Sequence, residues 1–193
     1  MGHCATSSIK QVTWTRNNTH TKTHNIMTPQ EAHEIKQERI NKQEDIDFEN
    51  TKKVFTQILN GYDVTFTQTA LLAATDMRFE ATSSSGHTRK FNVEIKTSNQ
   101  DMDKYDNHLL KVSKYCDMRE DTNPDEKLLY VVLSHDTEYF IYDLDKIDWN
   151  QVWCNNLYVN DYEFNPSEHQ KKVKTPYFHL PYTQACTSGI IPK

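Results

Sequence analysis

The sequence predicts a buried β-strand at the stretch Phe91-Asn92-Val93-Glu94-Ile95-Lys96-Thr97, in which apolar and polar side chains alternate. A period of two is typical of a strand that buries one face. The apolar residues of this strand are therefore predicted to point to the core, and Glu94 and Lys96 to the other face. One surface of the strand then carries a carboxylate and an ammonium group two positions apart.

A partner strand is predicted just before it, at residues 73–81. Alternation gives this segment an apolar face and puts Asp76 on the opposite one. Residues 83–87 have the composition of a turn, so the two strands are predicted to form a hairpin. Neighbours on one face of paired strands have Cβ atoms about 5 Å apart. We therefore expect the carboxylates of Asp76 and Glu94 to lie side by side.

A long helix is predicted from Thr28 to Asn60. It opens with the capping box Thr28-Pro29-Gln30-Glu31, and Gly61 is its predicted stop. Helical spacing puts one set of residues on a single face: His33, Gln37, Ile40, Glu44, Phe48, Thr51, Phe55, Ile58 and Leu59. The second half of this face is predicted to be core. In the first half, Glu44 stands where an apolar side chain is expected.

A second helix is predicted after the capping signal Ser98-Asn99-Gln100-Asp101, and it is expected to reach Cys116. Its outer side would show Lys104, His108, Lys111 and Lys114. Further strands are predicted at residues 62–66, 128–133, 139–144 and 177–180.

This order of elements predicts an α/β fold with a single domain, in which helices flank a central mixed β-sheet of about five strands. Three parts are expected along the chain. An irregular N-terminal arm covers residues 1–27, the α/β core covers 28–145, and an aromatic and polar extension at 146–193 packs on the core.

The pair of carboxylates suggests a metal site. Two groups as close as Asp76 and Glu94 repel each other and favour a divalent cation between them. Hard oxygen ligands of this kind suit Mg²⁺ or Mn²⁺. Lys96 would emerge on the same face, where an ammonium group can hold a phosphate or orient an attacking water. A bound metal polarises a phosphoryl oxygen, so these residue types are those needed to hydrolyse a phosphodiester.

This constellation resembles the PD-(D/E)xK (restriction-endonuclease-like) nuclease superfamily, in which a helix precedes a strand with Asp and a strand with Glu/Asp-x-Lys. The resemblance covers roughly residues 30–145 and rests on Thr75-Asp76 and Glu94-Ile95-Lys96. It implies a restriction-endonuclease-like core, catalytic roles for Asp76, Glu94 and Lys96, and the backbone carbonyl of Ile95 as a further metal ligand. Thr75 departs from the family pattern, which often has proline there.

Members of this superfamily often add an acidic residue from the first helix, and Glu44 is the best match. An unpaired carboxylate on a core-facing stripe would be costly, which favours a role for it. Asp47 and Glu49 are the alternatives on other faces. His33, about three turns before Glu44, is a further candidate, because some viral endonucleases of this fold bind manganese through a helix histidine.

Four basic residues are candidates for contacts with nucleic acid. Family members often place a Lys or Gln on the second helix, where Lys111 and Lys114 are predicted, and Arg89 and Lys90 form a short basic cluster at the base of the hairpin. A solvated surface explains the same residues equally well.

The composition limits the choice of partner and compartment. The net charge is −5, which argues against a protein that passively coats DNA. The four cysteines show no CxxC pair and are read as reduced thiols in the cytoplasm. No apolar run approaches the ~20 residues that span a bilayer, so no membrane partner is expected.

The predicted function is a Mg²⁺- or Mn²⁺-dependent endonuclease that acts on nucleic acid, with DNA favoured over RNA. The alternative is a catalytically degenerate nuclease fold that serves as a binding module for nucleic acid or protein. The sequence leaves a homodimer open.

Overall fold

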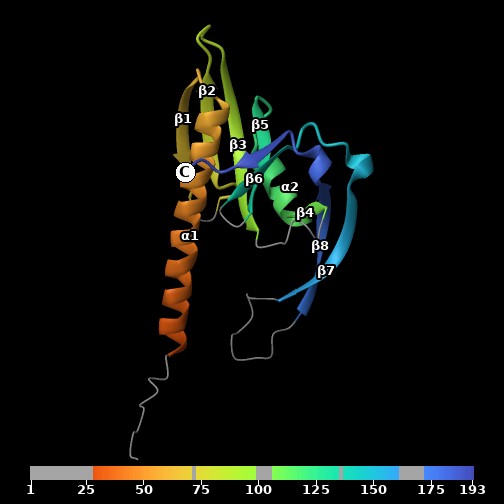
Figure 1. Cartoon of the computed structure of the whole chain (residues 1–193). Helices are drawn as coiled ribbons and strands as arrows, with labels where there is room; N and C mark the ends of the chain where they lie inside the picture. Colours follow the sequence, from red (N-terminus) through yellow and green to blue (C-terminus); the bar gives the residue numbers. More distant parts are fainter. Residues whose placement is uncertain (1–27, 71–72, 99–105, 135–136, 161–171) are drawn as a thin grey trace, which may run out of the picture. The chain divides into compact units, whose positions relative to one another are not determined.

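The computed structural model describes residues 28–70, 73–98, 106–134, 137–160 and 172–193 (Figure 1). Its elements are α1 (Pro29–Ile58), β1 (Asp63–Gln68), β2 (Met77–Thr82), β3 (Thr88–Ser98), β4 (Asn107–Lys111), α2 (Val112–Asp121), β5 (Glu126–Ser134), β6 (Glu138–Asp143), η1 (Trp149–Gln151), β7 (Trp153–Asn160), β8 (Lys172–Pro181), η2 (Tyr182–Gln184) and β9 (Thr187–Ile190). The chain divides into two units, Met1–Gln37 and Glu38–Lys193, and both sheets belong to the second. No helix in these ranges is both long and apolar enough to cross a membrane.

Two sheets form the second unit. The larger has six strands in the order β1-β2-β3-β5-β6-β9, and the smaller has three in the order β4-β8-β7. In the larger sheet β3 and β5 run parallel, and the other neighbours are antiparallel. The predicted α/β class with a mixed sheet is confirmed, although this sheet has six strands rather than about five. The predicted irregular arm at residues 1–27 lies outside the described residues.

The β2–β3 hairpin forms as the sequence predicts. Its register runs from Met77 opposite Val93 to Thr82 opposite Thr88. In the turn the amide of Ser83 donates to the carbonyl of His87, and Gly86 has a φ of 80°, which favours glycine. Strand β2 begins at Met77 rather than at residue 73, so Asp76 lies immediately before it.

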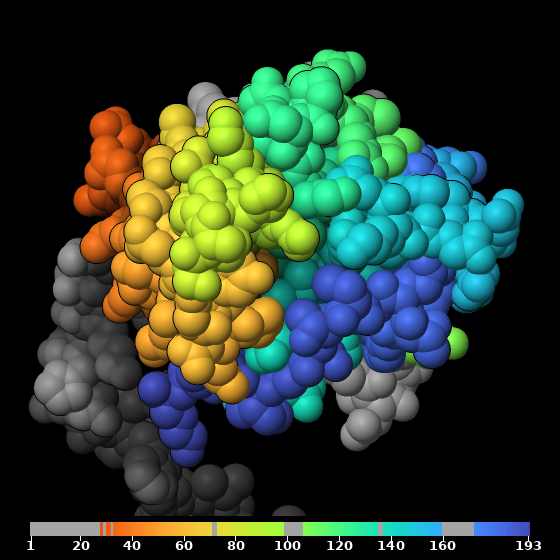
Figure 2. Space-filling model, turned by 90° about the horizontal axis from the view of Figure 1, so that it is seen from above, coloured from red at the N-terminus to blue at the C-terminus, as the bar shows by residue number. Residues whose placement is uncertain are grey.

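Salt bridges connect the hairpin to the segment formed by the end of α2 and the residues that follow it. Arg78 pairs with Asp121 at 2.8 Å and Lys90 with Asp125 at 3.5 Å. In Figure 2 the yellow-green hairpin accordingly lies beside the green surface of that segment.

Helix α1 begins with the predicted capping box. The Glu31 amide donates to Thr28 Oγ1 at 3.2 Å, and the Thr28 amide donates to Glu31 Oε2 at 2.8 Å. The helix ends at Ile58, two residues earlier than predicted, before Gly61 with a φ of 90°. The prediction that one face of this helix is core is confirmed for Thr51 and Phe55, which are buried. It is wrong for Ile58, which is 41% exposed.

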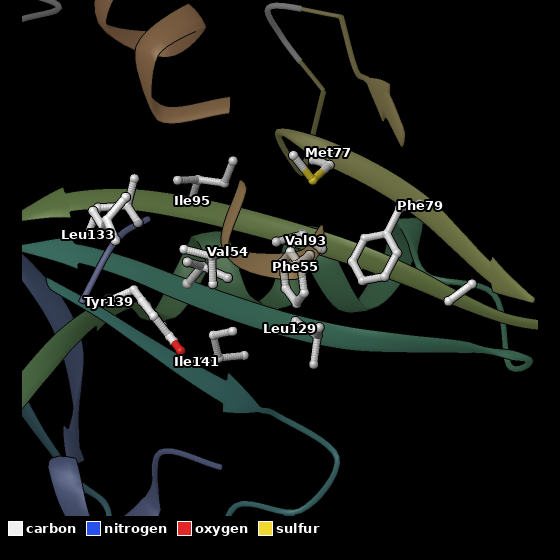
Figure 3. Packing of buried hydrophobic residues seen from close by; sticks show 13 residues of the cluster. Val54, Phe55, Met77, Phe79, Val93, Ile95, Leu129, Leu133, Tyr139 and Ile141 are labelled. Carbon is white, nitrogen blue, oxygen red and sulfur yellow. The ribbon is translucent and has the colours of Figure 1, made fainter. Parts of the chain in front are cut away.

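One hydrophobic core lies between α1 and the larger sheet. Phe55 and its neighbour Val54 pack against the apolar positions of β2, β3, β5 and β6, as Figure 3 shows. Phe79 lies among three aromatic rings, with its centroid 4.4 Å from that of Phe91 and 4.5 Å from that of Phe55.

A second hydrophobic core covers the other face of the larger sheet. Met118 of α2 and Leu110 and Leu180 of the smaller sheet pack against Tyr130 and Tyr142. Because both faces are covered, two polar positions of β3 are buried although the alternation pattern directs them away from the core: Asn92 is 0% and Glu94 9% exposed, while Lys96 stays exposed.

The prediction of a single helix reaching Cys116 is wrong at residues 107–111. These residues form β4, and α2 starts only at Val112. His108 and Leu110 are buried while Leu109 and Lys111 are more exposed, which is the alternation of a strand. Strand β4 pairs with β8, so long-range pairing overrides the local helical spacing here. The capping signal at residues 98–101 falls mostly outside the described residues.

The C-terminal residues contribute more regular structure than predicted. The predicted short strand at residues 177–180 is confirmed as part of β8. Two further strands, β7 and β9, were not predicted, and β9 joins the larger sheet beside β6.

We expect Phe79→Ala to lower the free energy of unfolding by about 3–5 kcal/mol, because it empties the centre of the aromatic cluster. Urea unfolding followed by circular dichroism measures this change. Thr67→Ala, at an exposed position of β1, is the control and should change stability by less than ~0.5 kcal/mol. Equal losses of unfolding free energy in the two variants would show that the aromatic cluster does not contribute more to stability than an exposed position does.

Candidate functional site

Asp76 is fixed against the backbone of β3. Its amide donates to the carbonyl of Val93 at 2.9 Å, and its Oδ2 accepts a hydrogen bond from the amide of Ile95 at 2.7 Å. These two contacts place Asp76 one step beyond the last paired residues of the hairpin, across from Glu94. A hydrogen bond between the Asp76 and Glu94 side chains favours the protonated form of Glu94. The two carboxyl groups therefore lie side by side.

Glu94 is the buried member of this carboxylate pair. Lys114 Nζ lies 3.0 Å from Glu94 Oε2, but this oxygen has no well-directed hydrogen bond among the described residues. Burial first, and then the charge of Asp76, raise the pKa of Glu94 to about 8, while the charge of Lys114 acts in the opposite direction. Without a further cation, Glu94 holds its proton at neutral pH.

Lys96 lies on the same face of β3 as Glu94, opposite Val132 of the parallel strand β5. A strand rises about 3.3 Å per residue, so their Cα atoms are separated by about 7 Å. The Lys96 side chain is exposed and lines a cavity of about 220 Å³. The site therefore has an ammonium group that Glu94 does not neutralise.

Glu44 lies within electrostatic reach of the pair. Its side chain on α1 is half-buried, and its pKa is raised by burial and then by the charges of Asp76, Asp45 and Asp47, while Lys114 lowers it. Glu49 is instead exposed and forms an ion pair with Lys52 at 3.6 Å. Glu44 and Asp47 are both half-buried, and Glu44 is the one whose pKa shift is traced, after burial, to the charge of Asp76.

Several predicted site residues lie elsewhere. His33 is exposed and belongs to the N-terminal unit, whereas Asp76 and Glu94 belong to the other unit. Lys111 is exposed at the end of β4 rather than on a helix. Arg89 and Lys90 lie at the hairpin end of β3, at least four residues from Glu94 and so about 13 Å away.

The alternation pattern did not reveal Tyr130 as a neighbour of the pair. It stands opposite Glu94 in the β3–β5 register, and its hydroxyl donates to the carbonyl of Leu109 at 2.8 Å. Burial raises the pKa of Tyr130 well above its usual value, and the charge of Glu94 adds to the shift. A strand-helix-strand order in the sequence indicates that the two strands pair in parallel, and this inference could have identified Tyr130 as a neighbour of Glu94.

The donors suit an open cation site rather than a closed cage. In the described ranges, no three His, Cys, Asp or Glu side chains converge enough to enclose a metal. Magnesium usually binds one or two carboxylates and keeps water or phosphate oxygens as its other ligands. Asp76 and the incompletely satisfied Glu94 fit that pattern.

The carbonyl of Ile95 fits the same site. The amide of Ile95 faces Asp76, and the amide and carbonyl of one strand residue point to the same edge. The β2–β3 register ends at Val93, two residues before Ile95, so the ladder does not extend to this carbonyl on that side.

Comparison of the chain with family models, curated proteins and solved structures finds no match. The resemblance to PD-(D/E)xK nucleases therefore stays a prediction that rests on the residues and their geometry.

We expect the stability of the metal-free protein to fall between pH 6.5 and pH 8 by about 1–2 kcal/mol. In this range folded Glu94 keeps its proton, because its pKa is about 8, whereas the unfolded chain has lost it near 4.5. The folded state then binds more protons, so stability decreases as the pH rises. Burial lowers the pKa of His108 to about 4 from 6.5, so His108 costs stability only below that range.

Urea unfolding in EDTA at several pH values measures this slope. Glu94→Gln should flatten it, and Glu80→Gln, at an exposed position of the same hairpin, should leave it unchanged. An unchanged slope in Glu94→Gln would rule out a raised pKa at this position.

Proposed function

We propose that this chain is a Mg²⁺- or Mn²⁺-dependent nuclease that hydrolyses phosphodiester bonds of nucleic acid, with DNA favoured. The observation that carries the proposal is the buried Glu94 beside Asp76, with an oxygen that lacks a directed hydrogen bond. Two carboxylates this close are unfavourable without a cation between them, and they suit a cation that also binds phosphate. Strongly shifted carboxylates of this kind concentrate at functional sites.

The chain's own residues divide the work of hydrolysis. Asp76, Glu94 and the Ile95 carbonyl would hold the metal, and the amide of Ile95 keeps the Asp76 carboxylate in place. When bound, the metal supplies Lewis-acid polarisation of the phosphoryl group. Lys96 holds the phosphate or orients the attacking water. The water oxygen forms a bond to phosphorus, the bond to one sugar oxygen breaks, and that oxygen leaves with a proton.

Glu44 and Lys114 have supporting roles in this proposal. Glu44 adds negative potential at Asp76 and can hold the metal through a water. Lys114 balances Glu94 in the free protein, and it is released to a phosphate when the metal takes its place.

A second candidate is a degenerate nuclease fold that serves as a binding module. The observation that favours it is the contact between Lys114 and Glu94, which already gives the buried carboxylate a positive partner. In a binding module this pair would be permanent and the metal unnecessary.

We expect purified protein to cleave plasmid, single-stranded DNA or RNA in Mg²⁺ or Mn²⁺, and Asp76→Asn and Lys96→Met to lower the rate at least ~100-fold. The asparagine keeps an acceptor for the Ile95 amide, and the methionine keeps the stem of the lysine, so both variants should fold. Gel assays with labelled substrates measure the rates.

The control for these variants comes from the same hairpin. Glu80→Gln changes an exposed position at the far end of the strands, so it should keep full activity. Cleavage that survives Asp76→Asn would place the active site elsewhere. An absence of both cleavage and metal binding would favour the binding module.

We expect Lys114→Met to increase the affinity for Mn²⁺ about 5- to 10-fold and to lower the cleavage rate. The ammonium group 3.0 Å from Glu94 competes with a metal for the carboxylate, and the same group is proposed to hold phosphate. Calorimetry at several pH values up to pH 9 measures the affinity, because Glu94 has a pKa of about 8 in the wild-type protein and the loss of Lys114 raises that pKa further. Lys111→Met, at an exposed position before α2, is the control and should leave the affinity unchanged. A lower affinity in Lys114→Met would show that Lys114 does not compete with the metal.

A further inference from the structure

A cavity of about 220 Å³ opens beside the carboxylate pair. Strands of both sheets line it. The lining includes Lys96, His108, Tyr130, Val132, Leu157 and Tyr177. Pockets for drug-sized ligands begin at about 300 Å³, so this cavity suits a single ring system.

The cavity adjoins the proposed metal site through two residues. Lys96 lines it and lies two positions beyond Glu94 on the same face of β3. Tyr130 also lines it and stands opposite Glu94 in the β3–β5 register. A ligand in the cavity therefore lies within one or two strand positions of Glu94.

The lining suits a flat ring with a polar edge. Val132, Leu157 and the rings of Tyr130 and Tyr177 are surfaces on which such a ring can pack. Lys96 supplies a polar edge, because its side chain is exposed and lines the cavity. His108 is a buried part of the wall, and its Nδ1 lies 2.7 Å from the Tyr142 hydroxyl.

We propose that this cavity binds one unpaired nucleobase of the strand whose phosphate lies at Asp76 and Glu94. The inference rests on the proposed nuclease function and narrows its substrate. A base that is stacked in an intact duplex cannot enter a cavity lined by strands of two sheets, so it must be single-stranded or extruded. The substrate class is therefore single-stranded or locally opened nucleic acid.

The charge of the chain supports a contribution from base contacts. A net charge of −5 leaves little general attraction for phosphates. Packing one base against aromatic and apolar side chains supplies affinity that does not depend on charge. Binding should accordingly weaken less with salt than it does for a basic nucleic-acid-binding protein.

Two neighbouring residues of β7 provide a matched pair of variants. Leu157 lines the cavity, whereas Tyr158 points to the opposite face of the strand, is 63% exposed and lies under Lys174. Leu157→Trp fills the cavity, and Tyr158→Trp adds the same ring on the other side. Urea unfolding of both variants shows first that each is folded.

The test is binding of a fluorescein-labelled eight-nucleotide single strand in EDTA, measured by anisotropy. We expect Leu157→Trp to weaken binding about 10-fold and Tyr158→Trp to leave it unchanged. The wild-type protein is also tested with a series of strands that each carry one abasic site at a different position. At one of these positions, the abasic site should weaken binding as much as Leu157→Trp does. That abasic site should cause no further loss in Leu157→Trp, because both changes remove the same contact.

The other outcomes separate the cavity from the nuclease. Equal binding of intact and abasic strands by the wild-type protein overturns the base site, even if the protein cleaves both. A nucleoside monophosphate that binds as tightly as the strand overturns it in favour of a free-nucleotide site. Base-dependent binding without cleavage in Mg²⁺ or Mn²⁺ keeps the base site and overturns the nuclease.

Discussion

Strand β3 is covered on both faces, and this coverage determines the chemistry of the side chains it carries. The apolar face packs in the core that includes α1, and the polar face borders the core formed by α2 and the smaller sheet. Glu94 is therefore buried although the alternation pattern marks it as an outward position. Burial beside Asp76 disfavours the charged carboxylate, which explains the raised pKa of Glu94.

The contact of Lys114 with Glu94 is a weak reason for the fold to keep this carboxylate. Taking two charges out of water costs about as much free energy as their attraction returns, and an apolar pair of similar size packs at least as well. One oxygen of Glu94, Oε2, also lacks a directed hydrogen bond among the described residues. A carboxylate held in these surroundings is better explained by a ligand that it binds than by the stability it adds.

The parts of the fold that depend on nearby residues could be predicted from the sequence. The capping box of α1 and the β2–β3 hairpin rest on residues a few positions apart, and the alternation within the hairpin placed Asp76 and Glu94 together. Strand β4 could not be predicted in this way, because its partner strand is distant: Asn107 contacts His179, 72 residues later. The sequence predicted only part of β8, at residues 177–180, and an extension that packs on the core, without indicating which face of the larger sheet is covered.

The same long-range pairing explains why the sequence did not indicate the cavity or the surroundings of Glu94. Tyr130 reaches Glu94 through the parallel β3–β5 register, and Tyr177 reaches the cavity from β8. The sequence did predict the helical position of Lys114. This residue lies on α2, although the helix begins later than predicted. The sequence thus indicates which charged groups are present, and the sheet pairing decides which of them meet.

Glu94 can be neutralised by a proton, by Lys114 or by a divalent cation, and these three compete for one carboxylate. In the proposed nuclease, a phosphate would attract Lys114 away from Glu94 and bring negative charge that a metal held by Asp76 and Glu94 would balance. Departure of the lysine and binding of a metal would therefore be coupled through a single charge. A chain with a net charge of −5 would gain from such coupling, because positive charge would collect at the site only when phosphate is present. The buried pair would then favour a metal in the complex with nucleic acid more than in the free protein.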